Sequence, residues 1–361
     1  MSSHRPADPV EPLLPRIQAV LDGFLSGQTE SLAEIGPELS VLTDAAGDLL
    51  SGGKRLRPAF CYWGWRGAGG ADGDSIVTAA AALELFQAAA LVHDDVIDAS
   101  ATRRGRPSVH ARLAALHRTN GWAGDPDSFG EAGAILLGDL LLCWSDELLG
   151  ASGLDREQLA RARPVYERMR TEVGAGQYLD VLAQARRADP PEDRADRAHR
   201  VIYAKAARYS VERPLLLGGR AAGAPPDLLR GYTAYGLAIG EAFQLRDDVL
   251  GVFGDPNATG KPAGDDLREG KQTLLVTYAA MAAGPTQART LERLVGEPGL
   301  TPANVSELRT IITGTGALDR VEALIADRAE QAHAALDTTA VTPEARDALQ
   351  SLIGAATART S

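Results

Sequence analysis

Cysteine is scarce in this sequence, because only Cys61 and Cys143 occur among 361 residues. They lie far apart in apolar stretches, whereas disulfide frameworks and thiolate metal sites use several closely spaced cysteines. We therefore expect two reduced, buried thiols in a cytoplasmic protein.

Positive charge is also in deficit, with 37 Lys and Arg against 48 Asp and Glu and a net charge of −11. This balance disfavours general nucleic-acid binding, so no nucleic-acid partner is expected. A small anionic ligand would need local basic residues or metal ions against this background.

A secretion signal and a clear membrane span are both missing. The opening MSSHRPADPVEPLLP has no basic start followed by an apolar core. The apolar run 76–93 contains Glu84 and Gln87 and continues into Asp94, which favours a buried helix over membrane insertion.

Strand-like alternation is nearly absent, whereas apolar residues recur at helical spacing almost throughout. No short repeat and no long Gly/Ser or Pro-rich linker divides the chain. The sequence therefore predicts an all-α fold, with a disordered segment over 1–10 and a single domain over 11–361. Pro164 and Pro214 predict kinks or junctions. The expected helices span 10–26, 29–50, 56–67, 75–99, 107–118, 129–150, 155–185, 194–218, 226–253, 265–283, 287–296, 302–313, 317–337 and 342–357.

A first acidic cluster occurs in LVHDDVIDASATRRG, residues 91–105. On a helix, Asp94 and Asp98 share one face with Cβ atoms roughly 5–6 Å apart, while Asp95 points about 100° away. Such carboxylates repel each other unless they are protonated or bind a cation, and Mg²⁺ suits them. A solvated helix end is the alternative, although the helix dipole disfavours acid there.

A second acidic cluster occurs in FQLRDDVLGVFGDP, residues 243–256, where an apolar helix ends in Asp247 and Asp248. Gly251 occupies the i+4 position, so a third carboxylate is missing. A further pair, Asp265 and Asp266, follows across a Gly- and Pro-rich loop. Two such clusters suggest carboxylates that face a shared cavity.

Basic residues accompany both clusters. SGGKRLRP, residues 51–58, forms a Gly-rich turn into a helix, where N–H groups favour anions, although the P-loop pattern is absent. Each basic residue alone could be a solvated surface group. The candidates are Lys54, Arg55, Arg57, Arg103, Arg104, Lys205, Lys261 and Lys271.

Taken together, GGKRLRP, DDVID with RRG, Lys205, FQLRDD and GDPNATGKPAGDDLREGK resemble the motifs of the trans-isoprenyl diphosphate synthases, or polyprenyl synthetases. The order and spacing over 51–271 carry the resemblance, whereas residues 285–361 hold no motif. The resemblance implies the isoprenoid synthase fold, with long, mostly antiparallel helices around a deep cavity, usually as a homodimer.

The implied reaction joins isopentenyl diphosphate to dimethylallyl, geranyl or farnesyl diphosphate in a 1'-4, trans condensation. Mg²⁺, three ions per site, and basic side chains would neutralise the departing diphosphate as an allyl cation forms. The double bond of isopentenyl diphosphate would then attack, and a proton would leave to the diphosphate. We expect His93 to be a packed residue and not the general base.

The resemblance also implies residue roles. The metal ligands would be Asp94, Asp95, Asp98, Asp247 and Asp248. The allylic diphosphate would be bound by Arg103, Lys205 and Lys261, beside Gln244. Isopentenyl diphosphate would be bound by Lys54, Arg57, Arg104 and Gln87, and Lys271 matches a basic residue near the mouth. Two departures are Gly251 in place of the last Asp of the second motif and Ala206 in place of a hydroxyl residue that helps to stabilise the cation.

Product length is expected to depend on the helix that carries the first cluster. Ala90 and Ala89 lie four and five residues before Asp94, and both are small, whereas Phe86 lies eight before it. If Phe86 closes the end of the cavity that holds the growing chain, which we call the floor, the expected product has twenty carbons, as in geranylgeranyl diphosphate. Phe86 could instead be an ordinary core residue, and farnesyl or longer products remain the alternative.

Other functions are less consistent with these motifs. A class I terpene cyclase has Asn, Ser or Thr, and Glu in its second metal motif, where this chain has DDVLG, and it needs no site like GGKRLRP. A non-catalytic subunit would tend to lose one acidic cluster, and a helical scaffold would carry both by chance. Product sizing with Mg²⁺ and labelled isopentenyl diphosphate separates these functions.

Overall fold

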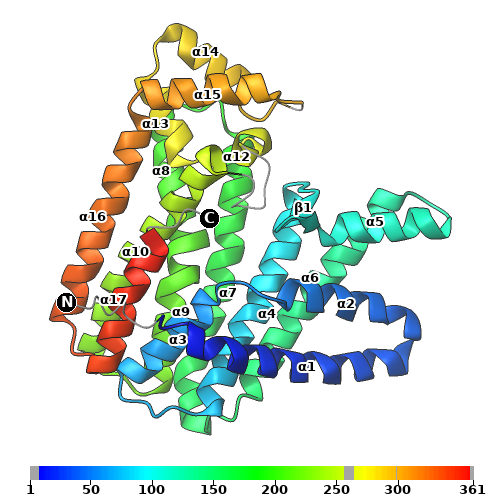
Figure 1. The fold of residues 1–361 in the computed structure, drawn as a ribbon, viewed down its shortest axis with the longest axis vertical. Coiled ribbons are helices and arrows are strands. Elements are labelled where there is room, and N and C mark those ends of the chain that lie inside the picture. The colour runs from blue at the N-terminus through cyan, green and yellow to red at the C-terminus, as the bar shows by residue number, and fades with distance from the viewer. Residues whose placement is uncertain (1–7, 256–263, 298, 358–361) are drawn as a thin grey trace, which may run out of the picture. The chain divides into compact units, whose positions relative to one another are not determined.

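The computed structural model describes residues 8–255, 264–297 and 299–357, and these are almost entirely helical (Figure 1). The predicted all-α fold is therefore confirmed. Within the described ranges, strand pairing is limited to a short hairpin of β1 (Thr102–Arg103) and β2 (Arg106–Pro107). The helices are η1 (Glu11–Leu13), α1 (Leu14–Ile35), η2 (Pro37–Leu39), α2 (Ser40–Leu50), α3 (Leu56–Gly67), α4 (Asp74–Ile97), α5 (Val109–Asn120), α6 (Pro126–Gly150), α7 (Arg156–Ala185), α8 (Pro191–Val201), η3 (Ile202–Glu212), α9 (Arg213–Ala221), α10 (Pro226–Phe253), α12 (Asp265–Glu269), α13 (Leu274–Ala282), α14 (Pro285–Leu294), α15 (Pro302–Gly314), α16 (Ala317–Thr338) and α17 (Pro343–Thr357).

The chain forms two compact units. The first comprises Met1–Arg161 with Gly218–Gly223, and the second comprises Ala162–Leu217 with Ala224–Ser361. The single domain expected over 11–361 stays a prediction. Of the expected N-terminal segment, 1–7 lies outside the described residues, whereas Trp63 Nε1 donates to the Pro9 carbonyl at 3.0 Å.

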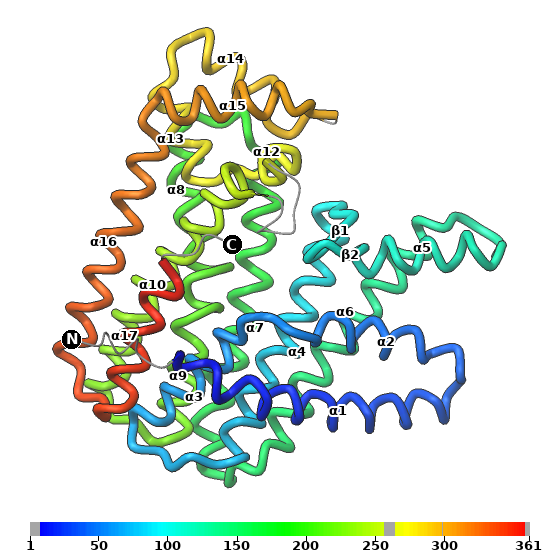
Figure 2. Tube along the Cα trace, viewed as in Figure 1, coloured from blue at the N-terminus to red at the C-terminus, as the bar shows by residue number. Residues whose placement is uncertain are grey.

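Helix α4 is the central helix of the first unit and packs against α6, α3 and α1 (Figure 2). Its alanines at 79–82, 88 and 89 are at most 3% exposed, and such small side chains allow close helix contact. Ser145 Oγ on α6 donates to the Ala82 carbonyl at 2.6 Å across this contact.

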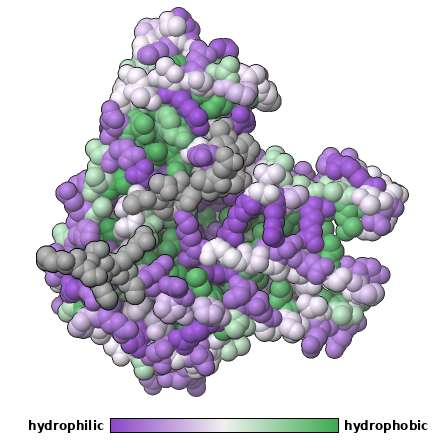
Figure 3. All heavy atoms as spheres, in the orientation of Figure 1, coloured by the Kyte–Doolittle hydropathy of each residue, from purple (hydrophilic) through white to green (hydrophobic). Residues whose placement is uncertain are grey.

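The apolar composition of α4 reflects burial. The helix is long and apolar enough to cross a membrane, but 72% of its apolar window is buried inside the protein. On the face drawn in Figure 3, hydrophilic side chains are interspersed with apolar ones. The prediction that this run is a core helix is therefore confirmed.

Helix η3 is a π-helix at the centre of the second unit, packed against α10 and α8. Three glycines border it closely. A Cβ at Gly176 of α7 would lie 2.6 Å from the Lys205 nitrogen, and one at Gly240 of α10 would lie 2.4 Å from Ala207 Cα. A Cβ at Gly236 would lie 2.6 Å from Glu212 Cα. Because these three glycines have no side chain, the backbones of α7 and α10 can lie this close to η3.

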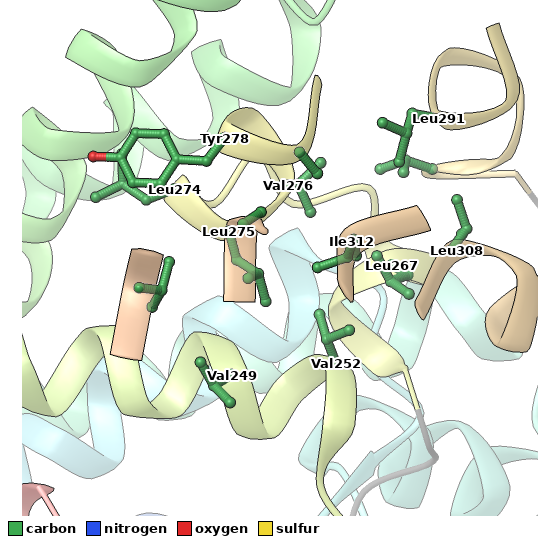
Figure 4. Close-up of a cluster of buried hydrophobic side chains, with 14 of the residues drawn as sticks. Val249, Val252, Leu267, Leu274, Leu275, Val276, Tyr278, Leu291, Leu308 and Ile312 are labelled. Atoms are coloured by element: carbon green, nitrogen blue, oxygen red, sulfur yellow. The ribbon is translucent and has the colours of Figure 1, made fainter. Parts of the chain in front are cut away.

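A cluster of buried side chains joins α10, α12, α13 and α15 within the second unit (Figure 4). Val252 of α10, Leu267 of α12, Leu275 of α13, and Leu308 of α15 are all fully buried. This core anchors the short helix α12 beside the end of α10.

Some expected boundaries are wrong. The break expected between 26 and 29 does not occur, because α1 continues through Gly27 and ends before Gly36. The helix expected over 265–283 is divided at Gly270, whose φ of 75° ends α12. The helix expected over 194–218 is three helices in succession, with Pro214 in the first turn of α9, where proline is tolerated.

Candidate active site

The first acidic cluster forms the last turn of α4. The N–H of Asp98 donates to the Asp94 carbonyl at 2.8 Å, which keeps the helical spacing through the end of the helix. Asp94 and Asp98 are half-buried, whereas Asp95 is 1% exposed. The structure therefore places Asp94 and Asp98 on one face, one turn apart, and turns Asp95 inward.

Arg103 is held on this helix end by the hairpin that follows it. Its Nε donates to Asp95 Oδ1 at 2.9 Å, and its Nη2 lies 3.8 Å from Asp94 Oδ2. Arg104 and Gly105 form the turn with φ of 53° and 73°, as two-residue hairpins require. The DDVID and RRG motifs are thus one local structure, in which Asp95 positions the arginine.

Left-handed backbone shapes the basic turn before α3. Gly52, Gly53 and Arg55 have φ of 74°, 96° and 46°. Arg55 is 5% exposed, pairs with buried Glu84 of α4, and donates to the Leu50 carbonyl. Breaking a buried pair by removing one partner costs about 3–5 kcal/mol, so this contact fixes the turn to α4.

Several guanidinium groups gather in this part of the first unit. A Cβ at Gly53 would lie 3.4 Å from Arg104 Nη2, so the glycine leaves room for that side chain. Burial lowers the pKa of Arg104, Glu84 opposes this effect, and neighbouring arginines lower it further. These arginines are Arg55, Arg103 and Arg57. An anion bound here would relieve their mutual repulsion.

The remaining candidates of the first unit lie on the same two elements. Lys54 is exposed on the basic turn, and Gln87 is half-buried on α4. Phe86 and Ala89 are buried, and Ala90 is half-buried.

His93 is a packed residue. Its Nε2 lies 3.2 Å from the Ile135 carbonyl, and a Cβ at Gly138 of α6 would lie 2.1 Å from it. The ring therefore contacts α6, and the expectation that His93 is not the general base stays a prediction.

The second acidic cluster lies in the last two turns of α10. Asp247 is half-buried, whereas Asp248 is 5% exposed and accepts a bond from Gln244 Nε2 at 2.7 Å. Burial raises the pKa of Asp248 well above its usual range, and Asp266 and Asp247 raise it further, opposed by Gln244 and Lys271. Gln244 therefore orients one member of the pair, and the pair favours a nearby cation.

Lys205 projects from η3 and donates to Asp180 Oδ2 of α7 at 2.7 Å. Asp180 was missed by the motif reasoning, because its relation to Lys205 depends on how α7 packs against η3. In the sequence, Glu84 is a charged residue within an apolar run, and a charged residue in such a run signals a buried ion pair. In the structure its partner is Arg55. Lys271 lies 2.6 Å from Glu269, and Lys261 lies outside the described residues.

The carboxylates of each cluster suit a hard divalent cation, whose preferred ligands are oxygens. Within 8–255, 264–297 and 299–357, no group of three Asp, Glu, His or Cys side chains that could hold a metal ion is found.

Comparison with known proteins first defines the class. The crystal structure of geranylgeranyl pyrophosphate synthase from Corynebacterium glutamicum, complexed with isoprenyl diphosphate and magnesium, superposes with a TM-score of 0.92 at 39% identity. The match covers 96% of this chain and 99% of that one. The protein therefore has the all-α isoprenoid synthase fold.

The sequence comparisons then define the family. The polyprenyl synthetase profile matches residues 40–312. Geranylfarnesyl diphosphate synthase of Aeropyrum pernix is 33% identical over 84% of this chain and 89% of its own length. The (2E,6E)-farnesyl diphosphate synthase of Mycobacterium tuberculosis strain H37Rv is 34% identical over 72% of this chain and 66% of its own length. The chain belongs to the polyprenyl synthetase family and is a prenyltransferase.

Proposed function

We propose that this prenyltransferase condenses isopentenyl diphosphate with an allylic diphosphate and that its main product is geranylgeranyl diphosphate. One observation carries the proposal: the end of α4, its hairpin and the basic turn bring a carboxylate turn and a group of guanidinium ions together within the first unit. A protein with a net charge of −11 concentrates basic groups in this way where it binds anions.

The basic groups divide between two diphosphates. Arg57, Arg104 and Lys54 lie on or against the basic turn, and with Gln87 they are assigned to isopentenyl diphosphate. Arg103 lies against Asp94 and Asp95, and it is assigned to the allylic diphosphate. The second unit would add further groups to the allylic diphosphate, namely Asp247, Asp248, Gln244, Lys205, Lys261 and Lys271.

Magnesium, with three ions per site, would neutralise the charge that grows on the departing diphosphate when it is bound. Asp94 and Asp98 would hold it from the first unit, with Asp95 acting through Arg103 as well. Fixed guanidinium and ammonium groups need no reorganisation as charge develops, so they stabilise the transition state directly. His93 is packed against α6, so the departed diphosphate is assigned as the proton acceptor.

The proposed product length rests on α4. Ala89 is fully buried and Ala90 half-buried one turn before Asp94, so neither stops a growing chain there. Phe86 is buried one turn further on and is assigned as the floor. The names of the relatives span farnesyl, geranylgeranyl and geranylfarnesyl synthases, and the side chain at this floor is the proposed discriminator.

We assign the working form as a cytoplasmic homodimer. Helix α6 exposes Leu136 by 60%, Ile135 by 45% and Phe129 by 40%. A second copy that covers these side chains would remove an apolar face from water.

The test is product analysis with Mg²⁺, labelled isopentenyl diphosphate and each of dimethylallyl, geranyl and farnesyl diphosphate. We expect twenty-carbon diphosphate from the wild type and at least about a 100-fold loss of kcat/KM in Asp94→Asn, because a ligand of the leaving group is removed. Asp44→Asn, an exposed carboxylate on α2, is the matched control and should be unaffected. A cyclic hydrocarbon formed without isopentenyl diphosphate would contradict the proposal and indicate a cyclase.

A further inference from the structure

A cavity of about 860 Å³ lies within the second unit, between α7, α8, η3, α10 and α16. Its volume falls in the range of about 300–1,000 Å³ that small-molecule sites occupy. None of the described residues that line it was assigned above to magnesium or to a diphosphate. The proposed reaction therefore leaves this cavity without a ligand, and the chemistry of its walls has to identify one.

Most of the cavity wall is apolar. Ile202 and Ala207 of η3 and Ala238 of α10 are at most 6% exposed, and Leu179 of α7 and Leu237 of α10 are half-buried. A hydrocarbon chain placed against these side chains would leave water at a gain of about 25 cal/mol for each Å² buried. The wall therefore favours a ligand whose larger part is apolar.

The polar part of the wall contains a carboxylate that is already paired. Arg328 Nε of α16 donates to Glu241 Oε2 of α10 at 2.8 Å, and its Nη1 donates to Asp327 Oδ2 at 2.7 Å. The hydrogen bond to Glu241 raises the pKa of Arg328. His199 Nδ1 lies 3.9 Å from Glu241 Oε1 on the other side. Glu241 and Arg328 therefore neutralise each other and offer no net charge to a ligand.

Arg200 is the remaining cation of the wall. It is exposed in the last turn of α8, and no ion pair or side-chain hydrogen bond joins it to another described residue. A guanidinium group binds a carboxylate through two parallel N–H bonds. One unpaired cation matches one negative charge, whereas a diphosphate carries several and would be repelled by the carboxylate of Glu241.

We infer that this cavity binds a fatty-acid carboxylate, with its hydrocarbon chain against η3 and α10 and its carboxylate on Arg200. The inference goes beyond the proposed function and does not depend on it. Leu179 and Ala204 line the cavity and directly precede Asp180 and Lys205, which form an ion pair. The bound chain would therefore lie beside the helix segment that carries Lys205.

The test is calorimetric titration of the full chain with laurate, below its critical micelle concentration and in chelator. Dodecyltrimethylammonium, which has the same chain length and the opposite charge, is the matched probe. Arg200→Glu reverses the charge that would hold the carboxylate, and Ala234→Trp fills the cavity from an exposed position on α10. The control variants are Arg156→Glu and Ala326→Trp, at exposed positions of α7 and α16 outside the cavity wall.

We expect one laurate per chain, with affinity at least about ten-fold lower in Arg200→Glu and in Ala234→Trp. Both control variants should bind laurate as the wild type does. Dodecyltrimethylammonium should bind the wild type at least about ten-fold more weakly than laurate, because its head would meet Arg200.

Three results would overturn the inference. The first is a wild-type protein that does not bind laurate below the critical micelle concentration. The second is unchanged laurate affinity in Arg200→Glu together with folded Ala234→Trp. The third is tighter binding of geranylgeranyl diphosphate than of laurate in chelator, lost in the same two variants, which would assign the cavity to a diphosphate. Because the titration involves neither turnover nor divalent metal, its failure is distinct from a failure of the proposed function.

Discussion

Asp248 is a buried carboxylate whose ionised form is disfavoured in the folded protein, although it belongs to the proposed metal site. Its carboxylate is buried beside Asp266 and Asp247 and accepts a hydrogen bond from Gln244 Nε2. Burial and repulsion favour the protonated form, so the pKa in the folded state lies above that in the unfolded chain, about 3.9. The stabilising contribution of this group is therefore complete below the unfolded pKa and is lost as pH rises through the folded pKa.

Replacing Asp248 by Asn should raise the melting temperature at pH 7 by about 2 °C or more without divalent metal. The difference should shrink toward pH 4, where the native carboxyl is protonated. Differential scanning fluorimetry of both proteins from pH 4 to 8 in chelator measures it. Other carboxylates, such as Glu172 with its lowered pKa, titrate in both proteins and cancel in the comparison. Parallel curves would contradict the prediction.

At the residue scale, spacing within one helix was predictable and contacts between helices were not. The shared face of Asp94 and Asp98 follows from helical geometry alone, as does the different direction of Asp95. Asp180 beside Lys205 and Asp266 beside Gly251 bring together residues from different elements. Their pairing depends on how these helices pack, which no local pattern encodes.

At the scale of elements, α4 combines a core helix with the proposed wall of a substrate channel. Its alanines contact α6 closely, and its last turn carries the acidic cluster. A growing chain that starts at Asp94 would pass the small side chains before it reached Phe86. The same helix would then set both the position of the chemistry and the length of the product.

Phe86→Ala should lengthen the product by at least one five-carbon unit, whereas Ala89→Phe should shorten it to fifteen carbons. Radiochromatography of dephosphorylated products measures both. Leu85→Ala is the control, because it removes a fully buried side chain from the same helix and costs about 2–5 kcal/mol of stability without facing the same direction. Unchanged product length in folded Phe86→Ala would refute the role of Phe86.

Helices were predictable from the sequence wherever apolar residues recur at helical spacing over many turns, as in α4, α6 and α10. The hairpin of β1 and β2 was not, because two residues per strand carry no alternation. The π-helix η3 was read as part of one longer helix, since its apolar residues recur much like those of an α-helix. It packs closely against Gly176, Gly236 and Gly240, and these contacts between elements carry no signal within the sequence of η3 itself.

At the scale of the whole molecule, the exposed apolar side chains of α6 are the basis of the proposed homodimer. Leu136, Ile135 and Phe129 are exposed on one helix, whereas Ile35, 77% exposed, is the last residue of α1. Large exposed apolar groups that gather on one element mark interaction surfaces more often than scattered ones do.

Leu136→Glu should therefore convert the protein from a dimer, about twice 38.0 kDa, to a monomer in light scattering coupled to size-exclusion chromatography. The added charge would have to be buried without a partner in the interface. Ile35→Glu is the matched control and should remain dimeric. A wild-type protein that already elutes as a monomer would contradict the proposed assembly.

The eleven residues of η3 have one more consequence. An i→i+5 hydrogen bond encloses one residue more than an ordinary helical bond, so a deletion within this stretch would let the backbone tighten into regular turns. Lys205 would then rotate by about 100° relative to the residues that follow it and leave Asp180. A chain shortened by one residue in this stretch would therefore keep a helix here, but the register of its side chains would change. The Lys205 ammonium group would then point away from Asp180.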